Sequence, residues 1–278
     1  MFDSLPGGRK IARHCQTLDT RQTTRLDRDS RMAVRDWLYA SYFRMERSLT
    51  SHVQYAQIHY ERFLDRHVHA DTRWLDVGCG RRLLPPWRED RERELIGRCR
   101  HLVGIDQDLA SLRDNASTKL LCYGAIRSLP FAPGAFTLVT ANMVVEHLAA
   151  PDIEFGEVRR VLAPDGIFLF HTPNADAYPT SVARRLPDSL KRVLALGLEG
   201  RSADDVFPTY YRANSATALR ELAHETGFEL VELLYVSTSA VFALVPPLAV
   251  VELLWLRQLA AEERAAERSN IIAVLRKR

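Results

Sequence analysis

The chain is poor in several features that mark particular classes of protein. Its 278 residues contain four cysteines (Cys15, Cys79, Cys99 and Cys122) and no CxxC spacing, so we expect neither a disulfide framework nor a zinc site. The formal net charge is only +3, which is too small for the dense basic stripe of a nucleic-acid-binding protein. No apolar run opens the chain, so we expect no signal peptide and a cytoplasmic location.

The chain does contain 46% hydrophobic residues, which is enough to bury a core. Residues 1–30 are polar and predict a flexible leader. Apolar positions at helical spacing then predict two helices over 31–68 that cover a sheet, with their aromatic side chains in the core. Beyond them, short apolar runs alternate with helical segments, as in βαβ units. We therefore predict one α/β domain over 31–278, a Rossmann-like, seven-stranded, mostly parallel sheet with helices on both faces.

The predicted strands are short apolar runs bounded by turn residues. They are Arg73–Val77, His101–Ile105, Lys119–Tyr123, Phe136–Thr140, Gly166–His171, Phe228–Val236 and Asn270–Leu275. The best-marked helices between them are Ile153–Leu162 and Ser215–Thr226, the second of which should end at Gly227. An apolar helical insertion over 240–268 precedes the last strand.

The strongest local signal is the segment Asp76-Val-Gly-Cys-Gly80 at the end of the first predicted strand. Glycines at 78 and 80 let the backbone turn tightly and approach a ligand, so side chains should not be tolerated there. The second strand ends in Asp106, where a carboxylate can accept hydrogen bonds from both hydroxyls of a ribose. The pattern predicts a nucleoside-containing cofactor.

Two cofactor classes share this pattern, and two residues separate them. A dinucleotide fingerprint has a third glycine where this chain has Leu83. Asp76 would also repel a pyrophosphate, whereas the sulfonium and ammonium groups of S-adenosylmethionine would be attracted to it. The residues therefore favour S-adenosylmethionine over a nicotinamide cofactor.

Six motifs occur in the order and spacing of class I S-adenosylmethionine-dependent methyltransferases, which the chain resembles over about residues 55–175. The most similar group is the broad one that includes the ubiquinone-biosynthesis O-methyltransferases. The motifs are Asp76–Gly80, Val103–Asp106, Leu129–Phe131, Phe136–Val139, Glu146–Leu148 and Arg160–Gly166.

This resemblance implies which residues contact the cofactor. The glycine loop and the end of the fourth strand would face its methionine end, Asp106 would bind the ribose, and the residues after the second and third strands would flank the adenine. The implied set is Asp76, Gly78, Cys79, Gly80, Asp106, Gln107, Ala125, Ile126 and Asn142.

The chain departs from its relatives at two positions. Ala125 stands where many have an aspartate for the adenine amino group, which removes one hydrogen bond worth about 0.5–1.5 kcal/mol. Met143 stands where the ubiquinone-type enzymes have a glutamate of a metal site. A thioether is a poor ligand for a hard cation, so we expect no bound metal.

Candidate residues for the acceptor side follow the fourth and fifth strands. Methyl transfer to oxygen often needs a base, and His147 and His171 both lie where ligands bind in such sheets. The alternatives are that His147 caps a helix and that His171 orients the next loop. Tyr210, Tyr211 and Arg212 either close over an acceptor or pack their own loop.

We therefore expect O-methylation of a small-molecule, lipid-linked or glycan acceptor. The alternatives are a non-catalytic cofactor-binding scaffold and a nicotinamide oxidoreductase. Nucleic acid is not expected as a partner, because the chain has no Pro-Cys dipeptide and reads Thr140-Ala-Asn-Met143 where adenine methyltransferases have an Asn/Asp-Pro-Pro-Tyr/Phe stretch. The apolar segment 240–256 either packs within the protein or across a homodimer interface, or makes peripheral contact with a membrane.

Overall fold

The structure is a computed structural model that describes residues 34–50, 56–177, 208–237 and 242–278. Contacts divide the chain into two compact units. One holds the described residues within His52–Ser239 and all of Leu256–Arg278, and the other holds those within Met1–Ser51 and Ala240–Trp255. The predicted leader over 1–30 lies outside the described residues, and the single domain over 31–278 remains a prediction.

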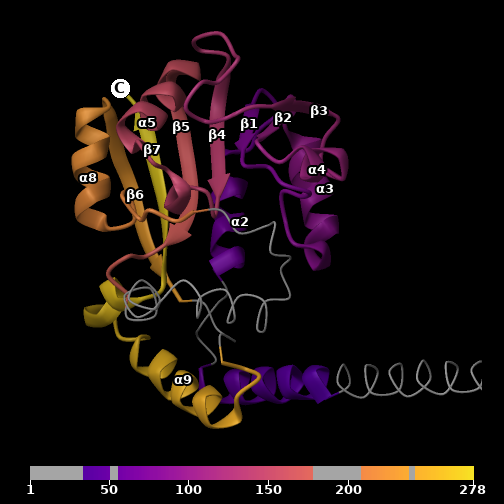
Figure 1. Cartoon of the computed structure of the whole chain (residues 1–278), viewed down its shortest axis with the longest axis vertical. Coiled ribbons are helices and arrows are strands. Elements are labelled where there is room, and N and C mark those ends of the chain that lie inside the picture. The colour runs from indigo at the N-terminus through magenta and orange to yellow at the C-terminus, as the bar shows by residue number, and fades with distance from the viewer. Residues whose placement is uncertain (1–33, 51–55, 178–207, 238–241) are drawn as a thin grey trace, which may run out of the picture. The chain divides into compact units, whose positions relative to one another are not determined.

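The larger unit is built on a seven-stranded sheet of order β3-β2-β1-β4-β5-β7-β6 (Figure 1). All neighbouring strands are parallel except that β7 runs antiparallel to both β5 and β6. This confirms the predicted mostly parallel sheet. The strands are β1 (Arg73–Val77), β2 (His101–Asp106), β3 (Leu120–Tyr123), β4 (Phe136–Asn142), β5 (Leu162–Pro173), β6 (Phe228–Val236) and β7 (Asn270–Lys277).

Helices connect these strands, and several begin where the sequence offers a capping residue. Asp108 accepts hydrogen bonds from the amides of Ala110 and Ser111 at the start of α4, and Ser215 caps α8 in the same way. Gly227, at φ +74°, follows the end of α8 as expected. Among the described residues, this unit contains the helices α2 (Ala56–His67), α3 (Glu89–Arg98), α4 (Leu109–Arg113), α5 (Pro151–Val161) and α8 (Ala216–Glu225), with 3-10 turns η1 (Pro86–Arg88), η2 (Val145–His147) and η5 (Glu262–Glu267).

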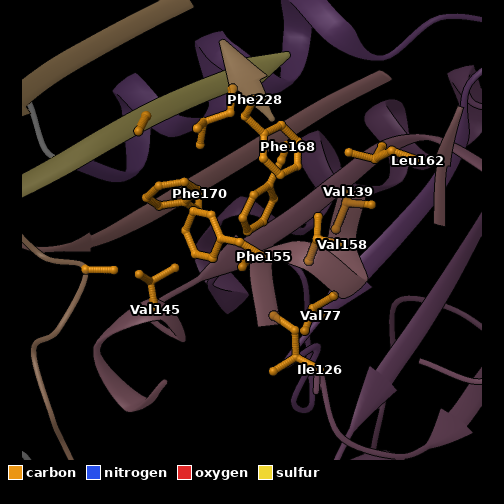
Figure 2. Packing of buried hydrophobic residues seen from close by; sticks show 14 of the residues in the cluster. Val77, Ile126, Val139, Val145, Phe155, Val158, Leu162, Phe168, Phe170 and Phe228 are labelled. Carbon is orange, nitrogen blue, oxygen red and sulfur yellow. The ribbon is translucent and has the colours of Figure 1, made fainter. Parts of the chain in front are cut away.

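The alternation of side chains along the strands produces a core on each face of the sheet. On one face Phe155 of α5 packs edge-on against Phe168 and Phe170 of β5, with ring centroids 5.2 and 5.8 Å apart (Figure 2). On the other face α2 buries Tyr60 and Phe63 in a cluster with Trp74 of β1. The prediction of helices on both faces is confirmed, as is the core position of the α2 aromatic residues.

The smaller unit contains a helix over residues 34–49 and most of α9 (Pro246–Gln258). In the first helix Tyr42 is buried, but Trp37 is 66% exposed, so the expected core position is wrong for this residue. The described part of the predicted insertion over 240–268 consists of α9 and η5. Among the residues that the structure describes, no helix combines the length and the apolar character needed to cross a membrane.

Candidate active site

A pocket of about 160 Å³ lies beyond the carboxyl ends of β1, β2, β3 and β4. The chain order of the strands reverses at β1, which has β2 on one side and β4 on the other, and open α/β sheets bind ligands at such a point. The pocket is lined by Val77, Gly78, Ile105, Asp106, Gln107, Gly124, Ile126, Met143, Val144 and His147.

Gly78 forms the floor of this pocket in a conformation that requires glycine. Its φ is +66°, and its amide donates to the carbonyl of Ile105 over 2.8 Å. A Cβ atom at this position would lie 2.4 Å from Cγ2 of Val144. Gly80 also has a positive φ, of +48°, but no atom lies within 4 Å of the place a Cβ would take.

Asp106 is held in place by the backbone on both sides. Its Oδ2 accepts the amide of Gly80, and its Oδ1 accepts the amide of Asp108, each over 2.8 Å. These bonds tie the glycine loop to the end of β2. Each carboxylate oxygen retains a lone pair for a ligand, so two adjacent hydroxyl groups fit this side chain.

The residues implied for the adenine differ in their exposure and in whether they line the pocket. Gln107 is exposed and Ile126 is buried, and both line the pocket. Ala125 is half-buried next to them but is not a lining residue. Cys79 is buried against Gly104 of β2 rather than in the pocket, and burial raises the pKa of its thiol.

Asp76 lies beneath the glycine loop and is only 5% exposed. The indole Nε1 of Trp74 donates to Oγ1 of Thr140 over 2.7 Å, and Thr140 in turn donates to Oδ1 of Asp76 over 2.6 Å. Burial raises the pKa of Asp76 to about 7 although the Thr140 bond opposes this, and the charges of Asp106 and Glu92 raise it further.

His171 and Asn142 pair with each other beneath the pocket and do not line it. The His171 Nδ1 lies 2.9 Å from Oδ1 of Asn142, and because an amide oxygen only accepts, Nδ1 is the donor. The Nε2 atom is buried and makes no hydrogen bond within the described residues. Burial lowers the pKa of His171 to about 4, so the ring is neutral at pH 7.

His147 is placed differently, on the wall of the pocket. Its Nδ1 lies 2.8 Å from the carbonyl oxygen of Pro208. A carbonyl cannot donate, so the proton is on Nδ1 and the lone pair of the neutral ring is on Nε2. The structure thus brings His147, and not His171, to the pocket with a nitrogen that can accept a proton.

Residues of the 208–214 segment hold η2 through contacts that the sequence did not reveal. The amides of Tyr210 and Tyr211 donate to the backbone carbonyl of Glu146, over 2.8 and 3.2 Å. The guanidinium of Arg212 donates to the carbonyl of Ala149 over 2.6 Å. These contacts attach the segment to the residues around His147, while the side chain of Tyr210 is 44% exposed, so both interpretations of the three residues stay open.

The side chain of Glu146, from the motif Glu146–Leu148, is a buried carboxylate. Its Oε2 accepts the hydroxyl of Thr172 over 3.0 Å, and Asn214 donates to the same hydroxyl oxygen over 2.6 Å. Its Oε1 lies 3.9 Å from Nε2 of His147. One signal was available, because an acid directly after Val144 and Val145 needs partners if that segment is buried.

A family model described as a methyltransferase domain matches residues 52–233, which is more than half of the chain. The chain belongs to the S-adenosylmethionine-dependent methyltransferase family. The match spans the pocket and every residue named in its lining.

Individual relatives agree with this assignment. The malonyl-[acyl-carrier protein] O-methyltransferase of Legionella pneumophila is 32% identical over 116 residues, 39% of each chain. A probable S-adenosylmethionine-dependent methyltransferase of Mycolicibacterium smegmatis is 27% identical over 188 residues, covering 66% of this chain and 62% of that one. The chain therefore spans less than two thirds of the length of these relatives.

Solved structures support the same fold. A chain from the complex between the Haloferax volcanii Trm112 methyltransferase activator and its methyltransferase is 17% identical, with a TM-score of 0.51. The alignment covers 87% of this chain and 96% of that chain.

S-adenosylmethionine is the methyl donor of this family, and the residues of the pocket suit it. Asp106 presents free lone pairs for the ribose hydroxyls, and Ile126 offers an apolar surface to the adenine ring. The glycine loop contributes Gly78 to the lining, whereas the buried Asp76 carboxyl does not line the pocket, so its place at the cationic end of the cofactor stays a prediction.

Within the described part of the chain, no three His, Cys, Asp or Glu side chains gather as a metal site requires. Met143 lines the pocket at φ +58°, and its amide donates to the carbonyl of His171 over 2.8 Å.

Proposed function

We propose that this methyltransferase transfers a methyl group to an oxygen atom of a small-molecule, lipid-linked or glycan acceptor. The observation that carries the proposal is the position of His147, which lines the same pocket as Asp106 and Gly78 and whose Nδ1 lies 2.8 Å from the carbonyl oxygen of Pro208. The name of the Legionella pneumophila relative, an O-methyltransferase, supports oxygen as the acceptor atom.

The residues around His147 suit the role of a general base. Bound S-adenosylmethionine would supply an electrophilic methyl group, which the acceptor oxygen would attack in line while S-adenosylhomocysteine leaves as the thioether. As that oxygen attacks, His147 Nε2 takes the hydroxyl proton, while the Pro208 carbonyl holds the ring through Nδ1. The Glu146 carboxylate, 3.9 Å from Nε2, stabilises the imidazolium that results.

Replacing His147 by glutamine is expected to lower kcat/KM by about 10²-fold or more for hydroxyl acceptors, since a general base contributes about 10²–10⁴-fold. An acceptor that is already a carboxylate has no proton to remove, so its methylation should change little. The measurement is S-adenosylhomocysteine formation with a panel of phenols, glycans and acyl carboxylates. His69→Gln, at an exposed histidine outside the pocket, is the control.

Three results would contradict this proposal in different ways. Equal rates for His147→Gln and the intact enzyme on a hydroxyl acceptor would show that His147 is not the general base. Binding of S-adenosylhomocysteine without turnover on any acceptor would favour the scaffold alternative. Heat from a titration with NAD, rather than with S-adenosylhomocysteine, would favour the oxidoreductase alternative.

The exposed surface of α9 suits contact with a second copy of the chain better than contact with a membrane. Val251 and Leu254 are 62% and 51% exposed, whereas Leu253 is fully buried. Helices that lie in membrane surfaces have a polar face rich in Lys and Arg, but Arg257 is the only basic residue of α9.

Replacing both Val251 and Leu254 by glutamate is therefore expected to shift the protein from dimer to monomer, because charges cannot be buried unpaired in an apolar interface. Sedimentation velocity measures this change, and the intact protein should stay at the bottom of a flotation gradient with anionic vesicles. Flotation of the intact protein, abolished in the double variant, would instead establish the membrane contact.

A further inference from the structure

A row of buried polar side chains leads from the wall of the pocket into the protein, and we call it the Thr172 network: Glu146, Thr172 and Asn214. Glu146 Oε1 lies 3.9 Å from Nε2 of His147, which lines the pocket. Glu146 Oε2 accepts the Thr172 hydroxyl over 3.0 Å, and the oxygen of that hydroxyl accepts an N–H of Asn214 over 2.6 Å. Thr172 and Asn214 are fully buried, so bulk water does not compete for these bonds.

The direction of each bond in the Thr172 network follows from one backbone carbonyl group. Nδ2 of Asn214 lies 3.0 Å from the carbonyl oxygen of Pro173, which can only accept a hydrogen bond. The amide oxygen of Asn214 in that position would face another oxygen, so the NH₂ group is fixed there, and its second N–H points at Thr172. A hydroxyl has a single proton, and Thr172 must therefore donate that proton to Glu146.

Glu146 is held at its backbone as well as at its carboxylate. The amides of Tyr210 and Tyr211 donate to its backbone carbonyl over 2.8 and 3.2 Å. With Oε2 bonded to Thr172, the remaining oxygen Oε1 is kept on the side of His147. The attraction between a carboxylate and an imidazolium weakens as their separation grows, so this orientation determines how well Glu146 stabilises a protonated His147.

We propose that Thr172 is a positioning residue of the methyl transfer: its hydroxyl, directed by Asn214, holds Glu146 towards His147. The inference rests on the general base of the proposed function. In that step the acceptor O–H bond breaks and an N–H bond forms at Nε2 of His147, while the Thr172 proton stays on Thr172. Neither Thr172 nor Asn214 lines the pocket, so both act on the rate only through Glu146 and His147.

Two substitutions at Thr172 separate hydrogen bonding from packing. Thr172→Val keeps the shape and removes the hydroxyl, whereas Thr172→Ser keeps the hydroxyl and removes a methyl group. With the phenol or glycan that the intact protein methylates fastest, Thr172→Val is expected to lower kcat about tenfold, since a bond to a charged group is worth about that factor. Thr172→Ser should retain most of the kcat, and the affinity for S-adenosylhomocysteine should be unchanged in both variants. A larger loss in Thr172→Ser than in Thr172→Val would assign the effect to packing and overturn the inference.

A double substitution tests whether Thr172 acts through His147. In His147→Gln the network has no base to support, so adding Thr172→Val should lower the remaining kcat by less than about twofold. A further loss as large as in the intact protein would overturn the inference and leave the general base in place. Equal rates for His147→Gln and the intact protein would overturn the proposed function and the inference together.

Circular dichroism checks that each variant folds. If Thr172→Val does not fold, Asn214→Ala takes its place, because it removes the donor that directs the Thr172 proton towards Glu146. It should lower kcat in the intact protein and add little to His147→Gln. Equal losses in the two backgrounds would again overturn the inference.

Discussion

Replacing Gly78 by valine is expected to lower the affinity for S-adenosylhomocysteine more than 100-fold. The new Cβ would lie 2.4 Å from Cγ2 of Val144, and the φ of +66° is one that β-branched residues avoid. Val144 cannot rotate far out of the way, because its own side chain is stiff and lines the same pocket. Calorimetry measures the affinity, and circular dichroism confirms that the variant folds.

Alanine variants separate the collision from the backbone strain. Gly78→Ala and Gly80→Ala both place a side chain at positive φ, but at Gly80 nothing lies within 4 Å of the new atom. Gly80→Ala should therefore weaken binding only slightly. Adding Val144→Ala to Gly78→Ala removes the colliding atom and should restore part of the affinity. If the second substitution restores nothing, the collision is not the cause.

The strands could be predicted because their apolar residues alternate in short runs between turn residues. β1 matches its predicted bounds, Arg73–Val77, whereas β5 begins at Leu162 rather than at Gly166. The Pro164-Asp165-Gly166 stretch, which predicts a turn, lies within β5 as an irregularity. Asp165 there has φ +59°, and the register with β4 shifts between Phe136 and Leu138. The sequence of β5 alone does not show that β4 pairs with it on both sides of such a bulge.

Two residues of the pocket could be predicted because their local backbone requires them. Gly78 needs a positive φ, and Asp106 follows a strand end, and both properties are visible locally. The partners of Glu146 were not predictable, since Thr172 and Asn214 reach it only through the fold. For the same reason the sequence could not distinguish His147 from His171, whereas tertiary packing buries His171 and leaves it out of the pocket lining.

Replacing Asp106 by alanine is expected to cost at least a tenfold loss of S-adenosylhomocysteine affinity, since hydrogen bonds to a charged group contribute about 1.5–3 kcal/mol each. From the structure we expect Asp106→Asn to lose affinity for S-adenosylhomocysteine as well. Both carboxylate oxygens accept backbone amides, from Gly80 and from Asp108. An asparagine has one oxygen, so its NH₂ group must face one of those N–H donors, and the ribose loses an acceptor on the same side.

Asp108→Asn is the matched control, because it makes the same chemical change two residues away. Asp108 caps α4 through the amides of Ala110 and Ser111 and does not line the pocket, and asparagine caps helices about as well as aspartate. Its affinity for S-adenosylhomocysteine should stay within about twofold of the intact protein, since a preserved cap leaves the pocket unchanged. An Asp106→Asn variant that binds as tightly as this control would show that the ribose is recognised elsewhere, because Asp106 is the one carboxylate among the described residues of the pocket lining.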